Sequence, residues 1–379
     1  MHFSLIPKMG LRDLLYAGTP QEAFGWAADR LYFSHGRIAL LNGARLLARL
    51  KPAKRNILVP AYICEETLWP LRAAGFGLDY YEIDDDLKAN TAQLQELISA
   101  DTLAVMAVHY FGIPQELEKI RELCDRTGVF LIEDCAHALG GRAIHGPLGS
   151  SGDISIFSMR KFLPVPDGGA LVINNPRLSA ATEEIKLAAK KESAGFIKLL
   201  ASSALNEMEN RWGICIRSLI KRESNKNNIE DLCPRPDLAG IKKGFIDNKG
   251  MSSRARRMFV GYDIERMSAQ RRANYNIMAE KLLGLNGIKV PGPEITAGGS
   301  PYVLPVCAAN HPHQLAIIRA LIKEGKYVTD WPTLPIDLND QKLQGAECLR
   351  NRIILLPVHQ NLPESVAARI IQTIKEARI

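Results

Sequence analysis

Short apolar runs alternate with amphipathic stretches along the first half of the chain. The runs, rich in Val, Ile and Leu, lie at residues 57–59, 78–83, 103–109, 129–132, 154–157 and 170–173. Between two of them, residues 115–126 place apolar side chains at the spacing of one helix face. Strands that alternate with helices are typical of a mainly parallel sheet with helices on both faces. The pattern therefore predicts an α/β fold for this half of the chain.

The pattern changes twice after residue 176. Residues 177–250 have a helical and basic character, which predicts an insertion. From about residue 266 a long helical stretch leads into a second series of strands and helices, at residues 288–290, 302–307, 313–324, 327–329 and 353–358. We therefore expect a large domain over residues 1–265, which contains the insertion, and a smaller C-terminal α/β domain over residues 266–379.

The composition is that of a soluble globular protein. Hydrophobic residues make up 46% of the 379 residues, and the mean hydropathy is −0.07. No apolar run approaches the roughly 20 residues that cross a bilayer, and the N-terminal residues lack the order of a signal peptide. The seven cysteines form no Cys-x-x-Cys pair, and the eight histidines show no metal-binding spacing. We therefore expect a cytoplasmic protein without a disulfide framework or a metal site.

The net charge of +7 is concentrated in one segment. Residues 177–257 hold 17 Lys or Arg and 10 Asp or Glu, so the rest of the chain is neutral. No nucleic-acid-binding motif accompanies this charge, and we expect no nucleic-acid partner. In the simpler interpretation, residues 196–222 pack an apolar face on the large domain or on a partner subunit. In the alternative, Trp212 and its apolar neighbours contact a membrane surface weakly. The basic side chains that would then face anionic headgroups are Lys198, Arg211, Arg217, Lys221 and Arg222.

The candidate chemistry lies at the ends of two predicted strands. One apolar run ends in Asp134, with His137 three residues later, and another ends in Ser158 with Lys161 three residues later. Side chains at strand ends of an α/β sheet project into the ligand crevice. An acid, an imidazole, a hydroxyl and an amine suit pyridoxal phosphate: the amine forms a Schiff base with the aldehyde, and the acid keeps the pyridine nitrogen protonated. The hydroxyl of Ser158 suits the phosphate.

Two sequence fragments resemble a known family. Glu-Asp-Cys-Ala-His at residues 133–137 is followed by Gly-Asp-Ile-Ser-Ile-Phe-Ser at residues 152–158, then by a lysine and a Gly-Gly-Ala strand. This pattern resembles the DegT/DnrJ/StrS family of fold type I, pyridoxal-phosphate-dependent aminotransferases, which act mostly on nucleotide-linked keto sugars. The resemblance extends from about residue 36 to the C-terminal region. It implies that Lys161 and Asp134 are catalytic, that His137 lies near the cofactor ring and its 3-hydroxyl, and that Ser158 holds the phosphate.

Residues 34–40 and 59–64 resemble two further parts of the family pattern. The first starts a helix at Gly36 under the cofactor phosphate, where free N–H groups and the helix dipole attract an anion. Arg37 replaces a small hydroxyl residue there, and either adds a phosphate contact or points away. The second presents the residue that stacks on the cofactor ring. The usual aromatic residue is replaced by Cys64, which leaves Tyr62 as the stacking candidate.

The chain also departs from the family pattern. Two residues fewer than usual separate the serine from the lysine, but counting back from Gly168 still selects Lys161. Arg160 is excluded because a guanidinium stays protonated and cannot form a Schiff base. The family's Asn-Tyr-Arg loop, which reaches into the neighbouring subunit's site, is reduced to residues 251–254. The resemblance implies a homodimer in which Ser252 takes the place of the asparagine as a cofactor contact.

The expected function is that of an aminotransferase. The resemblance implies transfer of an amino group from an amino acid, glutamate in the family, to a nucleotide-linked keto sugar in polysaccharide or glycoconjugate biosynthesis. One alternative is a pyridoxal-phosphate-dependent sugar lyase or dehydratase, but family members that dehydrate have lost the lysine that Lys161 retains. The other alternative is a non-catalytic binding or regulatory protein, which only the substitutions at Arg37 and Ser252 support.

Overall fold

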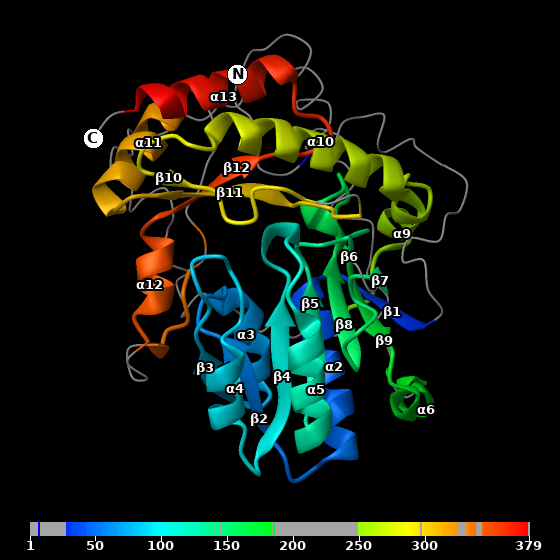
Figure 1. The fold of residues 1–379 in the computed structure, drawn as a ribbon. Coiled ribbons are helices and arrows are strands. Elements are labelled where there is room, and N and C mark those ends of the chain that lie inside the picture. Colours follow the sequence, from blue (N-terminus) through cyan, green and yellow to red (C-terminus); the bar gives the residue numbers. More distant parts are fainter. Residues whose placement is uncertain are drawn as a thin grey trace.

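Two main β-sheets and one two-stranded sheet organise the described part of the chain. The computed structural model describes residues 28–143, 146–183, 249–295, 298–324, 333–338 and 343–377, together with residues 7, 185 and 331. A seven-stranded sheet is built from the first half and a three-stranded sheet from the C-terminal part (Figure 1). The segment 196–222, with Trp212 and its basic neighbours, lies outside the described residues, as do residues 327–329. The membrane contact of that segment therefore stays a prediction.

The large sheet confirms the predicted α/β class. Its strands are β1 (Asp29–Phe33), β2 (Asn56–Pro60), β3 (Gly77–Tyr81), β4 (Thr102–Val108), β5 (Phe130–Cys135), β8 (Ile154–Ser158) and β9 (Gly169–Ile173). Their order in space is β1-β9-β8-β5-β4-β2-β3. The pairs from β3 to β8 are parallel, whereas β8 with β9 and β9 with β1 are antiparallel. All six predicted strands are present because strands buried on both faces are nearly continuous apolar runs.

Helices cover both faces of this sheet (Figure 1). The helices of the first half are α2 (Gly36–Leu50), α3 (Glu65–Ala73), α4 (Thr91–Leu97), α5 (Leu117–Thr127) and the short α6 (Ser179–Thr182). Helix α2 packs on β8, β9 and α3, while α4 and α5 contact each other. Three short 3-10 turns, η1 (Tyr110–Gly112), η2 (Met159–Lys161) and η3 (Pro176–Leu178), follow strands, and the small hairpin β6 (Arg142–Ala143) with β7 (Gly146–Pro147) precedes β8.

The C-terminal part is a second α/β layer, and the domain boundary between residues 265 and 266 stays a prediction. Its elements are α9 (Ser253–Val260), α10 (Ile264–Leu282), β10 (Ile288–Lys289), β11 (Val303–Ala308), α11 (His311–Lys323), α12 (Gly345–Arg350), β12 (Ile353–Pro357) and α13 (Glu364–Glu376). The sheet is antiparallel in the order β10-β11-β12. Helices α10 and α11 pack on β11, and α13 packs on both helices (Figure 1). No helix within the described ranges is long and apolar enough to span a bilayer.

The carboxyl ends of β4, β5 and β8 meet at one edge of the large sheet. Val108 is paired with Asp134 and Asp134 with Ile156, so the end of β5 lies between the ends of its neighbours. Gly169, at the start of β9, is paired with Ser158 at the end of β8. This register brings the predicted acid, hydroxyl and double glycine to the same edge.

Candidate active site

The amine of Lys161 lies against the imidazole of His137. Lys161 ends the turn η2 directly after β8, and its Nζ atom is 2.6 Å from Nε2 of His137. Burial lowers the pKa of Lys161, although the nearby carboxylate of Asp134 acts in the opposite direction. A lysine with a lowered pKa spends more time as the neutral, nucleophilic amine.

The ring of His137 is fixed on both faces. It is stacked against Phe111, with ring centroids 5.5 Å apart, and against Tyr302, with centroids 4.8 Å apart. Its Nδ1 atom accepts a hydrogen bond from the backbone N–H of Phe111 at 3.4 Å. Burial, and then the charge of Lys161, hold the pKa of His137 well below its usual value. Because Nδ1 is an acceptor, we assign the single proton of the neutral ring to Nε2, from which it points at the Lys161 amine.

Asp134 is a buried carboxylate at the end of β5. Only 5% of the residue is exposed, and Oδ1 accepts a hydrogen bond from the N–H of Ala136 at 2.8 Å. Burial raises the pKa of Asp134, and the Ala136 N–H and the charge of Lys161 offset part of that rise. A further cation at this carboxylate would stabilise its ionised form, and the protonated nitrogen of a pyridine ring is such a cation.

The start of helix α2 lies beside Ser158. A Cβ atom placed on Gly36 would be 3.6 Å from the Cβ atom of Ser158. A Cβ atom on Gly169 would lie 2.3 Å from the carbonyl carbon of His35 and 2.4 Å from the Gly36 nitrogen, so only glycine fits there. Gly169 therefore lets β9 run closely past the start of α2. The start of the helix consequently lies next to Ser158.

The guanidinium of Arg37 is turned toward α3. Its Nη1 atom is 3.4 Å from the Glu66 carboxylate, and Arg37 is partly buried. Burial lowers the pKa of Arg37, and Glu66 opposes this change. Of the two possibilities for Arg37, the structure thus shows an ion pair with α3, while the residue itself remains in the first turn of the helix beside Ser158.

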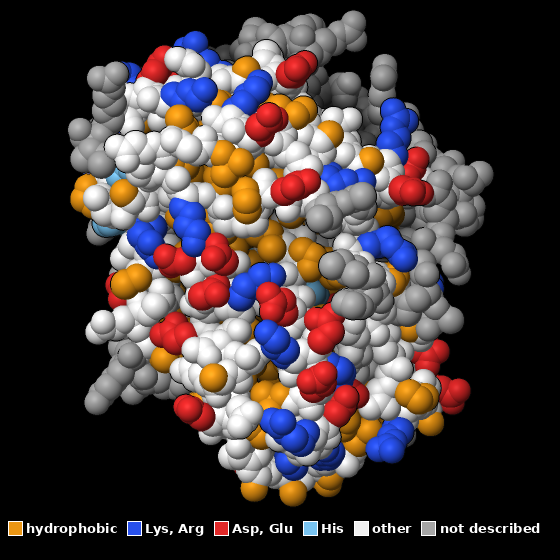
Figure 2. All heavy atoms as spheres, viewed as in Figure 1, with side chains coloured by type: hydrophobic (Ala, Val, Ile, Leu, Met, Phe, Trp, Pro, Cys, Tyr) orange, Lys and Arg blue, Asp and Glu red, His pale blue; other side chains and the backbone are white. Residues whose placement is uncertain are grey.

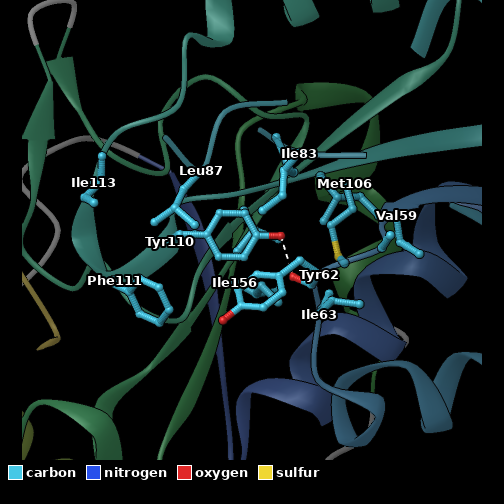
Figure 3. Packing of buried hydrophobic residues seen from close by; sticks show 14 of the residues in the cluster. Val59, Tyr62, Ile63, Ile83, Leu87, Met106, Tyr110, Phe111, Ile113 and Ile156 are labelled. Carbon is cyan, nitrogen blue, oxygen red and sulfur yellow. Dashed lines mark hydrogen bonds between the residues drawn. The ribbon is translucent and has the colours of Figure 1, made fainter. Parts of the chain in front are cut away.

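Tyr62 belongs to a fully buried aromatic cluster. Its hydroxyl donates to the carbonyl oxygen of Trp331, and its own carbonyl accepts from the hydroxyl of Tyr110 at 2.6 Å (Figure 3). Cys64, two residues later, is partly exposed, and the charge of Lys161 contributes to lowering the pKa of a thiol that burial raises. The stacking role of Tyr62 stays a prediction.

Ser252 is the N-cap of helix α9. Its Oγ atom accepts a hydrogen bond from the N–H of Ala255 at 3.3 Å, and its own N–H donates to Asp167 at 2.8 Å. Asp167 directly precedes the double glycine, so Ser252 is tied to the site segment of its own chain. Both contacts lie within one chain, and the role of Ser252 in a second subunit's site stays a prediction.

Three residues of the site were not predicted from the sequence. The indole of Trp331 packs edge-on against His137, with centroids 5.1 Å apart, and Tyr302 lies 5.6 Å from the Lys161 amine. The guanidinium of Arg271, which is fully buried, donates to the carbonyl of Phe162 at 3.1 Å and to that of Tyr302 at 3.1 Å. Burial lowers the pKa of Arg271 to about 9. Arg271 thereby fixes the residue that follows Lys161 to the C-terminal part of the chain.

A second buried cluster lies behind β5. Among the described residues, His109, Glu133 and Cys135 place potential metal ligands within 4.8 Å of one another. Glu133 accepts from the Nε2 atom of His109 at 2.8 Å and from the N–H groups of the turn at residues 149–152. The Nδ1 atom of His109 accepts from the N–H of Gln115 at 3.0 Å. Because N–H donors already surround the carboxylate, we interpret this cluster as a structural hydrogen-bond network.

The residues fit the three functional ends of pyridoxal phosphate. A lysine amine with a lowered pKa suits the aldehyde, and a buried carboxylate suits the pyridine nitrogen. The start of a long helix beside a serine hydroxyl suits the phosphate. The side chains present are thus of the types that bind these three groups of the cofactor.

Comparisons with known proteins agree with the resemblance. The model of the DegT/DnrJ/EryC1/StrS aminotransferase family matches residues 45–205. The GDP-perosamine synthase of Vibrio cholerae is 32% identical over 123 residues, which are 32% of this chain and 34% of that protein. A UDP-4-amino-4,6-dideoxy-N-acetyl-beta-L-altrosamine transaminase of Helicobacter pylori is 27% identical over 180 residues, 47% of each protein. The matches thus span between about a third and a half of the length of these curated relatives.

Solved structures extend the likeness over the whole chain. The aminotransferase TlmJ of Streptoalloteichus hindustanus is similar with a TM-score of 0.69 and 21% identity, over 98% of this chain and 91% of that one. Helicobacter pylori PseC, an aminotransferase involved in the biosynthesis of pseudoaminic acid, gives a TM-score of 0.68 and 17% identity over 100% and 99% of the two chains. The predicted resemblance is confirmed: the chain carries the DegT/DnrJ/EryC1/StrS aminotransferase pattern over residues 45–205 and has the fold of these aminotransferases.

Proposed function

We propose that this chain is a pyridoxal-phosphate-dependent aminotransferase that moves an amino group from an amino acid, glutamate as the first candidate, to a nucleotide-linked keto sugar. The observation that carries the proposal is the contact of 2.6 Å between the Lys161 amine and His137 beside the buried acid Asp134. The names of the relatives, a GDP-perosamine synthase and a UDP-aminosugar transaminase, support a nucleotide sugar as the acceptor and glycan biosynthesis as the setting.

Each end of the cofactor has a residue to hold it. Lys161 would bind the aldehyde, Asp134 the pyridine nitrogen, and Ser158 with the helix start at Gly36 the phosphate. His137 lies next to Lys161 and would lie near the ring and its 3-hydroxyl. When bound, pyridoxal phosphate supplies an electron-withdrawing ring that acidifies the Cα–H bond of the amino-acid donor.

The protein then has to move one proton. Lys161, displaced by the donor's amine, would take the proton from the donor Cα with its Nζ atom and give it to the carbon that carries the cofactor's aldehyde. Its lowered pKa favours the neutral amine that can accept this proton. His137, neutral and held between two rings, keeps the lysine amine in place with its Nε2–H group. Asp134 keeps the pyridine nitrogen protonated throughout. The aromatic rings of Phe111, Tyr302 and Trp331 exclude water from this region.

The active protein is a cytoplasmic homodimer in this proposal. Family members complete each phosphate site with a loop of the partner subunit, and residues 251–254 are the corresponding segment here. A dimer in light scattering is the expected result. A fully active monomer would contradict this part of the proposal without affecting the assignment of Lys161.

An absorbance experiment tests the function. Purified protein with pyridoxal phosphate should show the visible band of the lysine-bound cofactor, and glutamate should bleach it. Adding a nucleotide-linked keto sugar should restore the band, because the amino group has then been passed on. A band that glutamate and other amino acids leave unchanged would favour a non-catalytic protein. A band that a sugar nucleotide consumes without transfer of nitrogen would favour a dehydratase.

A further inference from the structure

A short segment of the C-terminal part lies against helix α3 of the large sheet. The guanidinium of Arg72 binds the carboxylate of Asp337 through two bonds of 2.7 Å, from Nη1 to Oδ2 and from Nη2 to Oδ1. The hydroxyl of Tyr80 donates to Oδ1 of the same carboxylate at 2.7 Å and also contacts Arg72. A fork of two parallel bonds fixes direction as well as distance. Residue 337 is therefore held tightly to α3 and β3.

The first turn of α3 binds the same segment a second time. The N–H of Glu65 donates to the carbonyl of Thr333 at 2.9 Å, and its Oε2 atom accepts from the N–H of Ile336 at 3.3 Å. Glu65 is buried, with 1% of it exposed, and its Oε1 atom lies 3.4 Å from Nε of Arg72. Glu65 thus joins the Arg72 guanidinium to residues 333–336: its carboxylate contacts Arg72 and the N–H of Ile336, and its backbone N–H binds Thr333.

The segment leads back to the active site through Trp331. The Trp331 ring contacts His137 at 5.1 Å, Phe111 at 5.6 Å and Tyr62 at 5.5 Å between centroids. The Tyr62 hydroxyl holds the Trp331 carbonyl, and Tyr62 lies three residues before Glu65. The indole is therefore placed against His137 by the part of the chain that α3 binds.

We propose that Arg72 is a positioning residue for the active site. By binding Asp337 it fixes residues 333–338, and through them the indole of Trp331 against the ring of His137. His137 in turn contacts the Lys161 amine at 2.6 Å. Arg72 itself is separated from that amine by this series of contacts and needs no contact with the substrate. The consequence for turnover rests on the proposed function, whereas the placement of Trp331 does not.

The charge states of Asp337 and Tyr80 support a stable attachment of residues 333–338 to α3 and β3. Burial opposes ionisation of Asp337, but the hydrogen bonds from Arg72 and Tyr80 outweigh it and lower the pKa of the carboxyl. Burial, followed by the bond to Asp337, raises the pKa of the Tyr80 hydroxyl. The carboxylate therefore stays ionised and the phenol protonated at neutral pH. A lysine cannot replace Arg72, because an ammonium lacks the planar pair of donors.

Two other ion pairs join the large sheet to the C-terminal part and provide matched controls. Arg352 pairs with Asp85, and Lys289 pairs with Asp86 at 2.8 Å. Acidic and basic side chains accordingly lie side by side across the middle of the face in Figure 2. Neither pair touches residues 333–338. Removing one of them weakens the junction between the two parts without releasing Trp331.

The experiment compares Arg72→Lys, Asp337→Asn and Arg352→Ala in the cofactor-loaded protein. Acrylamide quenching of the Trp331 emission is obtained as the difference between each variant and the same variant with Trp331→Phe, because three other tryptophans also emit. Arg72→Lys and Asp337→Asn should each increase this quenching and lower kcat/KM for the amino donor about tenfold, which corresponds to about 1.4 kcal/mol. Arg352→Ala should change neither the quenching of the Trp331 emission nor kcat/KM for the amino donor.

Two results would overturn the proposal. One is an Arg72→Lys protein whose Trp331 quenching equals that of the wild type. The other is an Arg352→Ala protein in which quenching of the Trp331 emission increases as much as in Arg72→Lys. The effect would then come from weakening the whole junction between the large sheet and the C-terminal part. In the Trp331→Phe background, Arg72→Lys should cost little further activity. If the wild type transfers no amino group, the quenching comparison still decides the placement of Trp331, and the failure then belongs to the proposed function alone.

Discussion

The Nζ atom of Lys161 and the Nε2 atom of His137 are 2.6 Å apart. Burial lowers the pKa of each group, and the N–H of Phe111 occupies the other ring nitrogen of His137. With its single proton on Nε2, the imidazole donates a hydrogen bond to the Lys161 amine whenever that amine is neutral. The lowered pKa of Lys161 and this contact favour the neutral amine, which is the state that proton transfer at a donor Cα requires.

The neutral state of His137 predicts a pH dependence of stability. In the unfolded chain this ring binds a proton below about pH 6.5, whereas in the folded chain its pKa lies well below that value. The unfolded state thus binds more protons as the pH falls below about 6.5, and the free energy of unfolding decreases by up to about 1.4 kcal/mol per pH unit. Urea unfolding of the cofactor-free protein between pH 5 and pH 8 (about 1.5 units on either side of that value) measures this slope. His137→Gln should make it shallower, and an unchanged slope would contradict the assignment.

Asp134→Asn should separate cofactor binding from proton transfer. An amide retains the shape of the carboxyl but cannot stabilise a protonated pyridine nitrogen, so the electron-withdrawing power of the ring is lost. We expect the variant to bind pyridoxal phosphate and to lose at least about a hundredfold in kcat for the half-reaction with glutamate, on the scale of an acid–base group. Stopped-flow absorbance checks this. Normal turnover by the variant would rule out the role given to Asp134.

Glu133→Gln should destabilise the fold. The carboxylate is completely buried and accepts hydrogen bonds from His109 and from the N–H groups of Ser151 at 3.0 Å and Gly152 at 2.9 Å. An amide turns one acceptor into a donor that faces other donors, at a cost of about 2–4 kcal/mol. Chemical denaturation measures the loss. The exposed Glu280→Gln is the control and should stay within about 0.5 kcal/mol of the wild type; an equally mild effect at Glu133 would refute the network.

Gly169→Ala should weaken cofactor binding. The new methyl group would lie 2.3–2.5 Å from His35 and Gly36 and would push the start of α2 away from Ser158. We expect a loss of stability of about 1–3 kcal/mol and at least about tenfold weaker binding of pyridoxal phosphate, measured by equilibrium dialysis. Gly75→Ala is the control, because its φ of +81° costs strain but no atom lies within 4 Å of the added methyl. Equal effects of the two substitutions on cofactor binding would contradict the steric argument.

The strands of the large sheet and the site residues at their ends were predictable because each is marked by a short pattern of neighbouring residues in the sequence. Fully buried parallel strands are apolar runs, and Asp134, Ser158 and Lys161 stand at their ends. Strand β1 was missed because its residues are mostly only partly buried and form no apolar run. The antiparallel placement of β9 beside β1 was likewise not predictable from alternation alone.

The remainder of the site depends on contacts between distant parts of the chain. Trp331 lies in a segment with no periodic pattern, and its carbonyl meets a hydroxyl 269 residues earlier. Arg271 appears in the sequence as one more basic residue of a helix, and only the fold shows that carbonyl oxygens surround it. Likewise, burial lowers the pKa values of Lys161 and His137, and the order of residues does not reveal which side chains are buried.

Covalent trapping tests the central claim, that Lys161 carries pyridoxal phosphate. Borohydride reduction of the loaded protein, followed by protease digestion and mass spectrometry, locates the pyridoxyl group on a single side chain. We predict that it lies on Lys161, and that Lys161→Ala abolishes the labelling and the visible absorbance band while leaving the fold intact by circular dichroism. A pyridoxyl group on any other lysine of the wild type, or a Lys161→Ala protein that is still labelled, would contradict the account.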